Sequence, residues 1–451
     1  MIRRIVAAAN ARPAAAKVVA NISWLVVERV LLMVVGLGVN VWFVRYVGPE
    51  QFGEYSYALS FVGLFTAFVA LGMDAVVVRE LTRSPESESE ILGTAVALRA
   101  AAGSVAWAAA VGTIIWMRAP PQTRTLVAIT AGSSLFVGLA GFELWFQAKQ
   151  AGRALVMSRM GVLLASYAVR IALIEANAPL EAFAVLFLAT SGATAAALFV
   201  GWRRLTERRS PLRWSQAFAR ALWRDSWPLI AMTVSIAIYM KIDQVMLTAM
   251  RGEAENGIYA VAVTFSELWY FLPLAVATSV YPMLVAARER GAPGEYAVAT
   301  QRFYDGIIGV GYAVAVPLCL AAGPLIQVLF GPQYGGSVTP FRVHIASLPF
   351  VCVGVARGRY LVTEGMTGFA VWATVAGAIA NVSGNLILIP RWGATGAAWS
   401  TLLSYALANF ISGFAYRPIR AQSMLLGKAL LGPVRALRGL AGHHREHVGM
   451  P

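Results

Sequence analysis

Charged side chains are scarce in this 451-residue sequence, where Asp, Glu, Lys and Arg make up 13% of the residues and hydrophobic residues make up 58%. A soluble domain carries about 25% charged residues, so the composition excludes an ordinary water-soluble protein. Only two cysteines occur, Cys319 and Cys352, and both lie in apolar segments. Their scarcity excludes a disulfide framework and a cysteine-rich metal site. We therefore expect neither a resident metal nor a cofactor.

Motifs of the common enzyme classes are also missing. No nucleophile elbow, P-loop, HExxH motif or dinucleotide fingerprint stands on a suitable loop. The net charge of +15 is spread between apolar segments instead of forming a basic domain, so we expect no nucleic-acid partner. The sequence indicates a membrane protein that is not an enzyme.

Apolar runs of about 20 residues recur from end to end, and each is long enough to cross about 30 Å of hydrocarbon as a helix. The first run is too long for the core of a signal peptide, so it is expected to remain as a span. We predict an all-α polytopic fold with about twelve transmembrane helices. The expected spans are 22–47, 55–78, 92–117, 122–147, 155–176, 181–202, 226–250, 257–287, 304–330, 339–361, 366–390 and 393–416.

The distribution of basic residues predicts the orientation. With the N-terminus inside, the cytoplasmic segments hold 28 of the 37 Lys and Arg residues and the outer loops hold five. This count assigns Arg99 and Arg357 to the cytoplasmic segments. Because cytoplasmic loops of membrane proteins are rich in Lys and Arg, we predict a protein of the cell inner (cytoplasmic) membrane with both termini cytoplasmic.

The long basic segment between spans six and seven suggests two lobes. The predicted parts are a cytoplasmic N-terminal segment (1–21), an N-lobe of spans one to six (22–202), a basic cytoplasmic linker (203–225), a C-lobe of spans seven to twelve (226–416) and a basic cytoplasmic tail (417–451). The tail can contact anionic lipid headgroups.

A weak internal repeat supports the two lobes. A Gly-x4-Gly-x-Tyr pattern occurs at 48–55 and again at 252–259, at an offset of 204 residues, and 150–174 aligns with 365–389 at an offset of 215. Because each lobe has an even number of spans, both lobes begin on the same side of the membrane, and the repeats are therefore parallel. Transporters with parallel repeats carry substrate between lobes that rock against each other, and we expect a central cavity between these lobes.

Several ionisable residues lie within the predicted spans, where each costs at least about 2.5 kcal/mol on insertion scales. The deepest are Glu28, Arg29, Arg170, Lys241, Asp243 and Glu267, and Arg342 lies nearer the outer end of its span. The side chains at 241 and 243 should point about 200° apart on a helix. Buried cations suit an anionic ligand, and buried carboxylates suit coupling to protons or Na⁺. The alternative is that these charges have a structural role and form salt bridges within one lobe.

Several segments together resemble one family. In the first half they are WLVVER (24–29), RYVGPEQFG (45–53), LGMD (71–74) and VREL (78–81), and in the second half YMKIDQVML (239–247), SELWYFLP (266–273) and LIPRWGATGA (388–397). In order and spacing they resemble the Wzx-type oligosaccharide flippases of the multidrug/oligosaccharidyl-lipid/polysaccharide exporter superfamily. The resemblance covers roughly residues 18–416.

The resemblance implies a transporter that flips an undecaprenyl-pyrophosphate-linked oligosaccharide from the inner to the outer leaflet by alternating access, as in O-antigen and lipopolysaccharide synthesis. It implies an anion site at Arg29 and Lys241 and ion coupling at Asp243 and Glu267. From their positions within the spans, we add Arg170 and Arg342 to the expected anion site and Glu28 to the expected coupling residues. Implied partners are the lipid-linked substrate, membrane lipids, a glycan polymerase and assembly proteins. The alternatives are a drug or metabolite exporter of the same superfamily and a membrane-embedded glycan polymerase or ligase.

Overall fold

The computed structural model describes residues 13–206, 211–290, 294–364 and 366–432, and helices account for nearly all of them, without a β-strand in these ranges. Nine helices of this described part are long and apolar enough to cross a membrane. In addition, α2 (Pro13–Thr66) contains the first predicted span and much of the second. The last of the nine, at 368–415, contains the final two spans on either side of Gly393. The predicted all-α membrane fold is confirmed.

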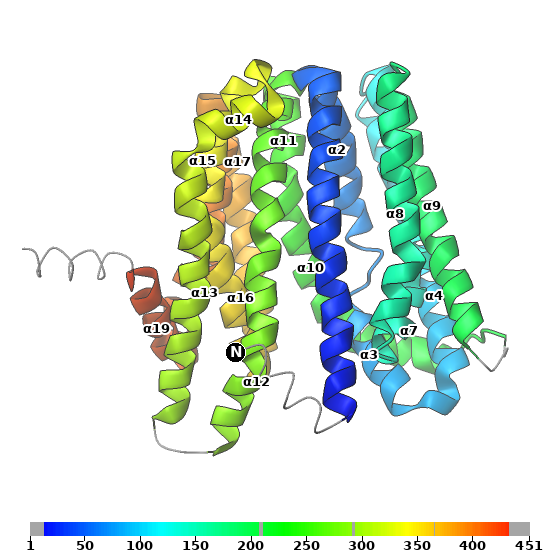
Figure 1. Cartoon of the computed structure of the whole chain (residues 1–451), viewed down its shortest axis with the longest axis vertical. Coiled ribbons are helices and arrows are strands. Elements are labelled where there is room, and N and C mark those ends of the chain that lie inside the picture. The colour runs from blue at the N-terminus through cyan, green and yellow to red at the C-terminus, as the bar shows by residue number, and fades with distance from the viewer. Residues whose placement is uncertain (1–12, 207–210, 291–293, 365, 433–451) are drawn as a thin grey trace, which may run out of the picture. The chain divides into compact units, whose positions relative to one another are not determined.

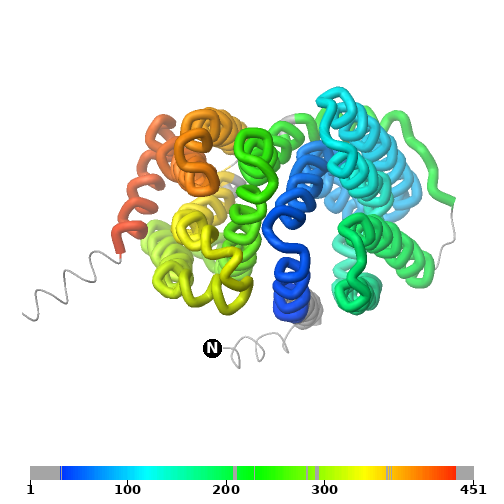
Figure 2. The backbone as a smooth tube through the Cα atoms, turned by 90° about the horizontal axis from the view of Figure 1, so that it is seen from above, coloured from blue at the N-terminus to red at the C-terminus, as the bar shows by residue number. Residues whose placement is uncertain are grey.

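The chain divides into two compact units, Met1–Ala237 and Ile238–Pro451, and the division falls within α10 (Gln216–Arg251). In Figure 1 the long helices of each unit run alongside one another, and Figure 2 views the same bundles from above. Besides α2 and the start of α10, unit 1 contains α3 (Asp74–Arg83), α4 (Glu88–Trp116), α5 (Pro121–Ala131), α6 (Ser133–Leu139), α7 (Glu143–Ala148), α8 (Gly152–Glu175) and α9 (Leu180–Leu205).

Unit 2 contains the rest of α10 and the helices that follow it. These are α11 (Glu253–Glu267), α12 (Phe271–Arg290), α13 (Glu295–Leu320), α14 (Ala322–Phe330), α15 (Val338–Ile345), α16 (Leu348–Thr363), α17 (Thr367–Ala406), α18 (Ser412–Ala415) and α19 (Arg420–Leu430). A π-helical segment, η5 (Leu407–Ile411), joins α17 to α18. In this segment, Ala408 O accepts hydrogen bonds from the side chains of Arg357 and Ser412.

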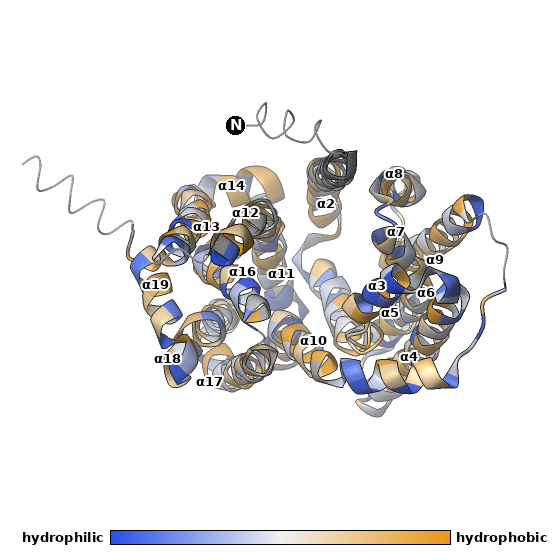
Figure 3. Ribbon diagram, turned by 90° about the horizontal axis from the view of Figure 1, so that it is seen from below, coloured by the Kyte–Doolittle hydropathy of each residue, from blue (hydrophilic) through white to orange (hydrophobic). Residues whose placement is uncertain are grey.

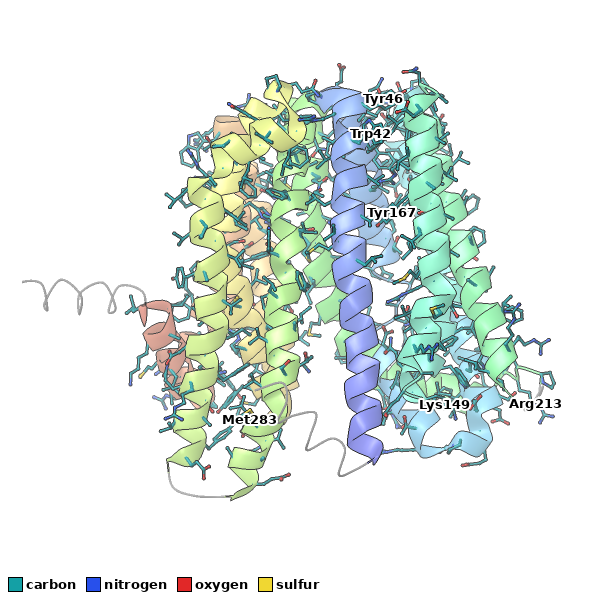
Figure 4. The ribbon with its side chains drawn as sticks, in the orientation of Figure 1. Trp42, Tyr46, Lys149, Tyr167, Arg213 and Met283 are labelled. Carbon is teal, nitrogen blue, oxygen red and sulfur yellow. The ribbon has the colours of Figure 1, made fainter. Side chains whose placement is uncertain are left out.

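The two ends of the unit 1 bundle carry different residues. Trp42 and Tyr46 lie near one end, and Lys149 and Arg213 lie near the other (Figure 4). Aromatic side chains with a polar tip favour the membrane–water interface, and basic residues favour the cytoplasmic side. The arrangement within unit 1 is the one expected for a bundle that crosses a bilayer.

Both copies of the repeated pattern begin with the same backbone turn. Gly48 adopts φ 75° and ψ 174°, and Gly252 adopts φ 92° and ψ 175°. This region of φ/ψ space is open essentially only to glycine. The two glycines therefore explain why the pattern recurs, since each allows one helix to end and the next to begin without a loop.

Replacing either turn glycine by alanine is expected to destabilise the protein by about 1–3 kcal/mol through backbone strain alone. Apart from the adjoining backbone, no atom lies within 4 Å of a Cβ built at Gly48 or Gly252, so a clash with the rest of the protein would not contribute. Gly38→Ala is the matched control, because Gly38 also has open space around it but lies inside α2. Denaturant unfolding of the purified variants in detergent measures the difference, and equal stability of the three variants would contradict the explanation.

Candidate functional site

The middle of α10 carries two of the predicted site residues, and they face different surroundings. Asp243 is 2% exposed, whereas the Lys241 side chain is 34% exposed. At 1.5 Å per residue, Lys241 lies about 15 Å from the end of α10 at Arg251. The helical spacing of the two residues thus places one charge inside unit 2 and leaves the other partly accessible.

The Asp243 carboxylate lies in a cage of hydrogen-bond donors. Tyr259 on α11 donates its hydroxyl to Oδ2 over 2.7 Å, and Asn385 on α17 donates Nδ2 to Oδ1 over 2.6 Å. The Thr401 hydroxyl also donates to Oδ2. Asn385 contacts Asn381 Oδ1 at 3.2 Å. All five side chains are almost completely buried, so these contacts replace the water that an isolated buried carboxylate would need.

The cage offers oxygen atoms to a further ligand. The buried Oδ1 of Asn385 has no hydrogen-bond partner among the described residues, and such an acceptor is unusual in a protein interior. Carboxylate, amide and hydroxyl oxygens are the ligands preferred by hard cations. The described residues contain no group of three or more His, Cys, Asp or Glu side chains that could hold a metal. A single carboxylate therefore suits a proton or a monovalent cation.

Lys241 forms an ion pair with a second predicted site residue. Its Nζ lies 3.4 Å from Oε2 of Glu267, the last residue of α11, and the Glu267 side chain is 21% exposed. The other oxygen, Glu267 Oε1, has no hydrogen-bond partner among the described residues. The pair is long for a charge-assisted hydrogen bond and partly open, so an anion could compete with Glu267 for the ammonium group.

Unit 1 carries a deep cation of its own, Arg170. On α8, its guanidinium lies over the Phe43 ring, 5.2 Å from the centroid. No carboxylate among the described residues pairs with it. Tyr55 contacts the same ring at a centroid distance of 5.3 Å. Its buried hydroxyl has no hydrogen-bond partner among the residues that the structure describes.

The remaining predicted site residues do not join these groups. Arg342 on α15 is exposed and donates Nε to Cys319 O over 3.2 Å. The side chains of Glu28 and Arg29 lie outside the described residues. The structure thus brings Lys241 and Glu267 together and surrounds Asp243 with uncharged partners.

The charge count assigned two arginines, Arg99 and Arg357, to cytoplasmic segments, and the structure shows that both are buried. Arg99 is 7% exposed and pairs with Asp74, and Arg357 is 4% exposed. Arg357 Nη1 donates to Ser412 Oγ over 3.0 Å, and Nη2 donates to Ala408 O in η5. Both residues fall inside predicted spans, at 92–117 and 339–361. Their position within these spans is the feature of the sequence that could have indicated their burial.

The internal repeat shows how the polar cage differs between the units. At the offset of 204, Val39 corresponds to Asp243 and Tyr55 to Tyr259, and at the offset of 215 Arg170 corresponds to Asn385. Val39 is buried and apolar. The buried carboxylate therefore occurs in unit 2 alone of these two equivalent positions. Unit 1 instead carries a cation, Arg170, at the position equivalent to Asn385.

This difference predicts opposite outcomes for one substitution at two equivalent tyrosines. Tyr259→Phe should destabilise the protein by about 1–3 kcal/mol, because it removes a donor from the buried Asp243 carboxylate. Tyr55→Phe should be neutral or slightly stabilising, because it removes a buried hydroxyl without a partner among the described residues. Thermal unfolding of the two variants side by side measures the effect, and equal losses would argue against the cage.

Comparison with known proteins adds sequence and fold relatives. Residues 18–287 match the family described as "Polysaccharide biosynthesis protein". The EPS I polysaccharide export inner membrane protein EpsE of Ralstonia nicotianae is 24% identical over 315 residues, which are 67% of this chain and 71% of that protein.

Solved structures share the fold at low sequence identity. The lipid II flippase MurJ in its inward closed conformation superposes with a TM-score of 0.70 and 14% identity over 90% of each chain. An inward-facing multidrug resistance MATE family transporter of the MOP superfamily gives a TM-score of 0.71 and 14% identity over 89% of this chain and 99% of the other. The fold is therefore that of membrane transporters and flippases. Because the family match covers more than half of the sequence, this chain belongs to the polysaccharide biosynthesis protein family.

Proposed function

We propose that this protein flips an undecaprenyl-pyrophosphate-linked oligosaccharide from the inner to the outer leaflet of the cell inner membrane. The two lobes would alternate in access, with a central cavity between them and the lipid tail kept in the bilayer. Its termini would be cytoplasmic, and it would act in O-antigen, lipopolysaccharide or related polysaccharide synthesis beside a glycan polymerase and assembly proteins. The family, the transporter fold and the polysaccharide-export relative support this proposal.

The observation that carries the proposal is the partly open ion pair between Lys241 and Glu267. A lysine at membrane depth is costly unless it has a partner or a function. Glu267 neutralises the ammonium while no substrate is bound, and a pyrophosphate carries more negative charge than one carboxylate. The headgroup can therefore displace Glu267, so that binding exchanges one ion pair for another without leaving a charge unpaired in the hydrocarbon.

Arg170 would provide a second contact for the anionic headgroup in unit 1. Its charge has no carboxylate partner in the described chain, and the Phe43 ring holds the guanidinium by a cation–π contact. Arg29 and Arg342 complete the proposed set of cations. Cations contributed by both lobes would let the headgroup keep a counter-charge as access changes.

Asp243 would couple transport to an ion gradient. The donors Tyr259, Asn385 and Thr401 stabilise the negative carboxylate, and Asn385 Oδ1 is available as a further ligand. A proton or Na⁺ entering the cage would cancel the buried charge and change the preferred packing of α10 against α11 and α17. Glu267, once released from Lys241, and Glu28 are secondary candidates for the same role.

A drug or metabolite exporter is the second candidate function, favoured by the superposition with a multidrug resistance transporter. In such a protein the acidic groups would bind a cationic substrate directly. Translocation assays separate the two functions. Proteoliposomes containing the purified protein should move a fluorescent lipid-linked oligosaccharide across the bilayer under a proton or Na⁺ gradient. Transport of a cationic dye without movement of the lipid would instead support the exporter.

A further inference from the structure

An aromatic groove lies in unit 2 where α17 begins and α18 ends. It encloses about 510 Å³ and is lined by Gly368, Phe369, Trp372, Ala415 and Tyr416. The Phe369 and Tyr416 rings are stacked with centroids 5.2 Å apart, and the Trp372 ring lies 5.7 Å from Phe369. Trp372 and Tyr416 are 52% and 42% exposed, so aromatic surface is accessible at the groove.

A buried cation lies directly behind this groove. The Arg357 guanidinium is 5.3 Å from the centroid of the Phe369 ring. Its hydrogen bonds go to Ser412 Oγ and Ala408 O, and no carboxylate in the described chain pairs with it. Because its partners are uncharged, the positive charge of Arg357 is not cancelled locally, and its field extends through the aromatic wall.

The chain that leaves the groove is also positive. Arg417 directly follows Tyr416 and Arg420 lies three residues further on; both are exposed, and Arg420 Nε donates a hydrogen bond to Phe414 O at 2.8 Å. Glu364 is the one acidic residue between positions 351 and 432, and it pairs with Arg288 at 2.9 Å. In Figure 3, which views the helix ends from below, hydrophilic residues are visible at α18 and α19.

We propose that this groove binds an acidic phospholipid. Arg417 and Arg420 would hold the phosphate, and an acyl chain would lie against Phe369, Trp372 and Tyr416. The chemistry selects this occupant, because apolar rings at a helix end suit an acyl chain at the bilayer interface and an excess of cations selects an anionic headgroup. The site is separate from Lys241 and Asp243 and does not depend on the flipping function.

The proposal can be tested by fluorescence of the full-length protein in lipid nanodiscs. Acyl chains brominated near the headgroup quench nearby tryptophans, and the share of Trp372 is obtained by subtracting the signal of Trp372→Phe. The nanodiscs contain phosphatidylglycerol as a minor component in phosphatidylcholine, and either lipid is brominated in turn. Quenching of Trp372 by the brominated phosphatidylglycerol should indicate that this lipid is enriched about tenfold or more beside the groove. Trp399→Phe, which removes another exposed tryptophan of α17, should report no enrichment.

The double variant Arg417→Gln/Arg420→Gln should abolish this enrichment. Arg391→Gln is the matched control, because Arg391 is also exposed and donates to a backbone carbonyl, Ile387 O, at 2.7 Å. If brominated phosphatidylglycerol and brominated phosphatidylcholine quench Trp372 equally at equal content in the unmodified protein, the proposal is overturned. It would also be overturned if the double variant kept its preference, or if native mass spectrometry showed a second copy of the chain on this face in a dimer lost on Trp372→Ser.

Discussion

Replacement of Lys241 by alanine is expected to lower translocation of the lipid-linked glycan by about 30-fold or more. Removing one member of a partly buried, hydrogen-bonded charge pair costs about 2–5 kcal/mol in binding, and 2 kcal/mol corresponds to roughly 30-fold. The variant should insert normally, because losing a charge from a span lowers the cost of insertion. Initial flipping rates in proteoliposomes and glycan display in cells measure the effect.

Lys149→Ala is a matched control for this prediction. Lys149 pairs with Glu88 at 2.8 Å, and its side chain is 34% exposed, as is that of Lys241. It lies outside the proposed anion site, so its loss should leave flipping nearly unchanged. Unimpaired flipping by Lys241→Ala would remove Lys241 from the site.

Exchange of the two charges distinguishes substrate binding from structural support. The double variant Lys241→Glu/Glu267→Lys restores an ion pair between α10 and α11. If the pair only supports the fold, the exchange should recover both stability and flipping. If Lys241 binds the headgroup from its own position, stability should recover while flipping stays low, and recovery of both would count against the proposed site.

Asp243→Asn is expected to abolish the response of flipping to an ion gradient. Asparagine has nearly the same shape, so the cage keeps its packing, but it carries no charge that a proton or Na⁺ could neutralise. The residual rate should be the same with and without the gradient, whereas the unmodified protein should be stimulated severalfold. Flipping measured in parallel with imposed pH and Na⁺ gradients gives both rates and identifies the coupling ion.

Asp305→Asn provides the control for charge removal. Asp305 on α13 is exposed and accepts a hydrogen bond from Gln301 Nε2 at 2.8 Å. This substitution should preserve the gradient response. The coupling role fails if Asp243→Asn responds to both gradients as the unmodified protein does, and a lower rate with an intact response would assign Asp243 to structural support.

The spans could be predicted from the sequence, and the repeated glycine pattern could be recognised in it, because the causes of both are local. A span needs a run of apolar residues long enough to cross hydrocarbon, and a turn such as those at Gly48 and Gly252 needs a residue that tolerates φ near 75–92°. The opposite facing of Lys241 and Asp243 follows from helical geometry. These features depend on short stretches of chain.

The partners of the charges could not be predicted, because they come from distant segments. Asn385 and Thr401 follow Asp243 by 142 and 158 residues, and no pattern in one sequence states which faces of α10 and α17 meet. The sequence showed that Lys241 needs a partner or a function, but it did not select Glu267. That choice depends on how the end of α11 packs.

The buried arginines illustrate a different difficulty. Arg99 and Arg357 lie within a few turns of predicted span ends, where long side chains often reach the headgroups. Arg357 instead reaches a carbonyl of η5, and Arg99 reaches Asp74 and lies 3.5 Å from Ala70 O, beside the irregular backbone before α3. Interrupted helices create such acceptors inside the bundle, and the sequence gives no direct indication of a π-helical turn.

The π-helical segment has a consequence for the shape of unit 2. A π turn contains roughly one residue more than an α turn, and each residue of an α-helix turns the chain by about 100°. Deleting a single residue between Leu407 and Ile411 would regularise the helix and rotate everything beyond it, so that Ala415 and Tyr416 would face away from Phe369. One surplus amino acid thus sets the direction in which the end of this unit faces the surrounding membrane.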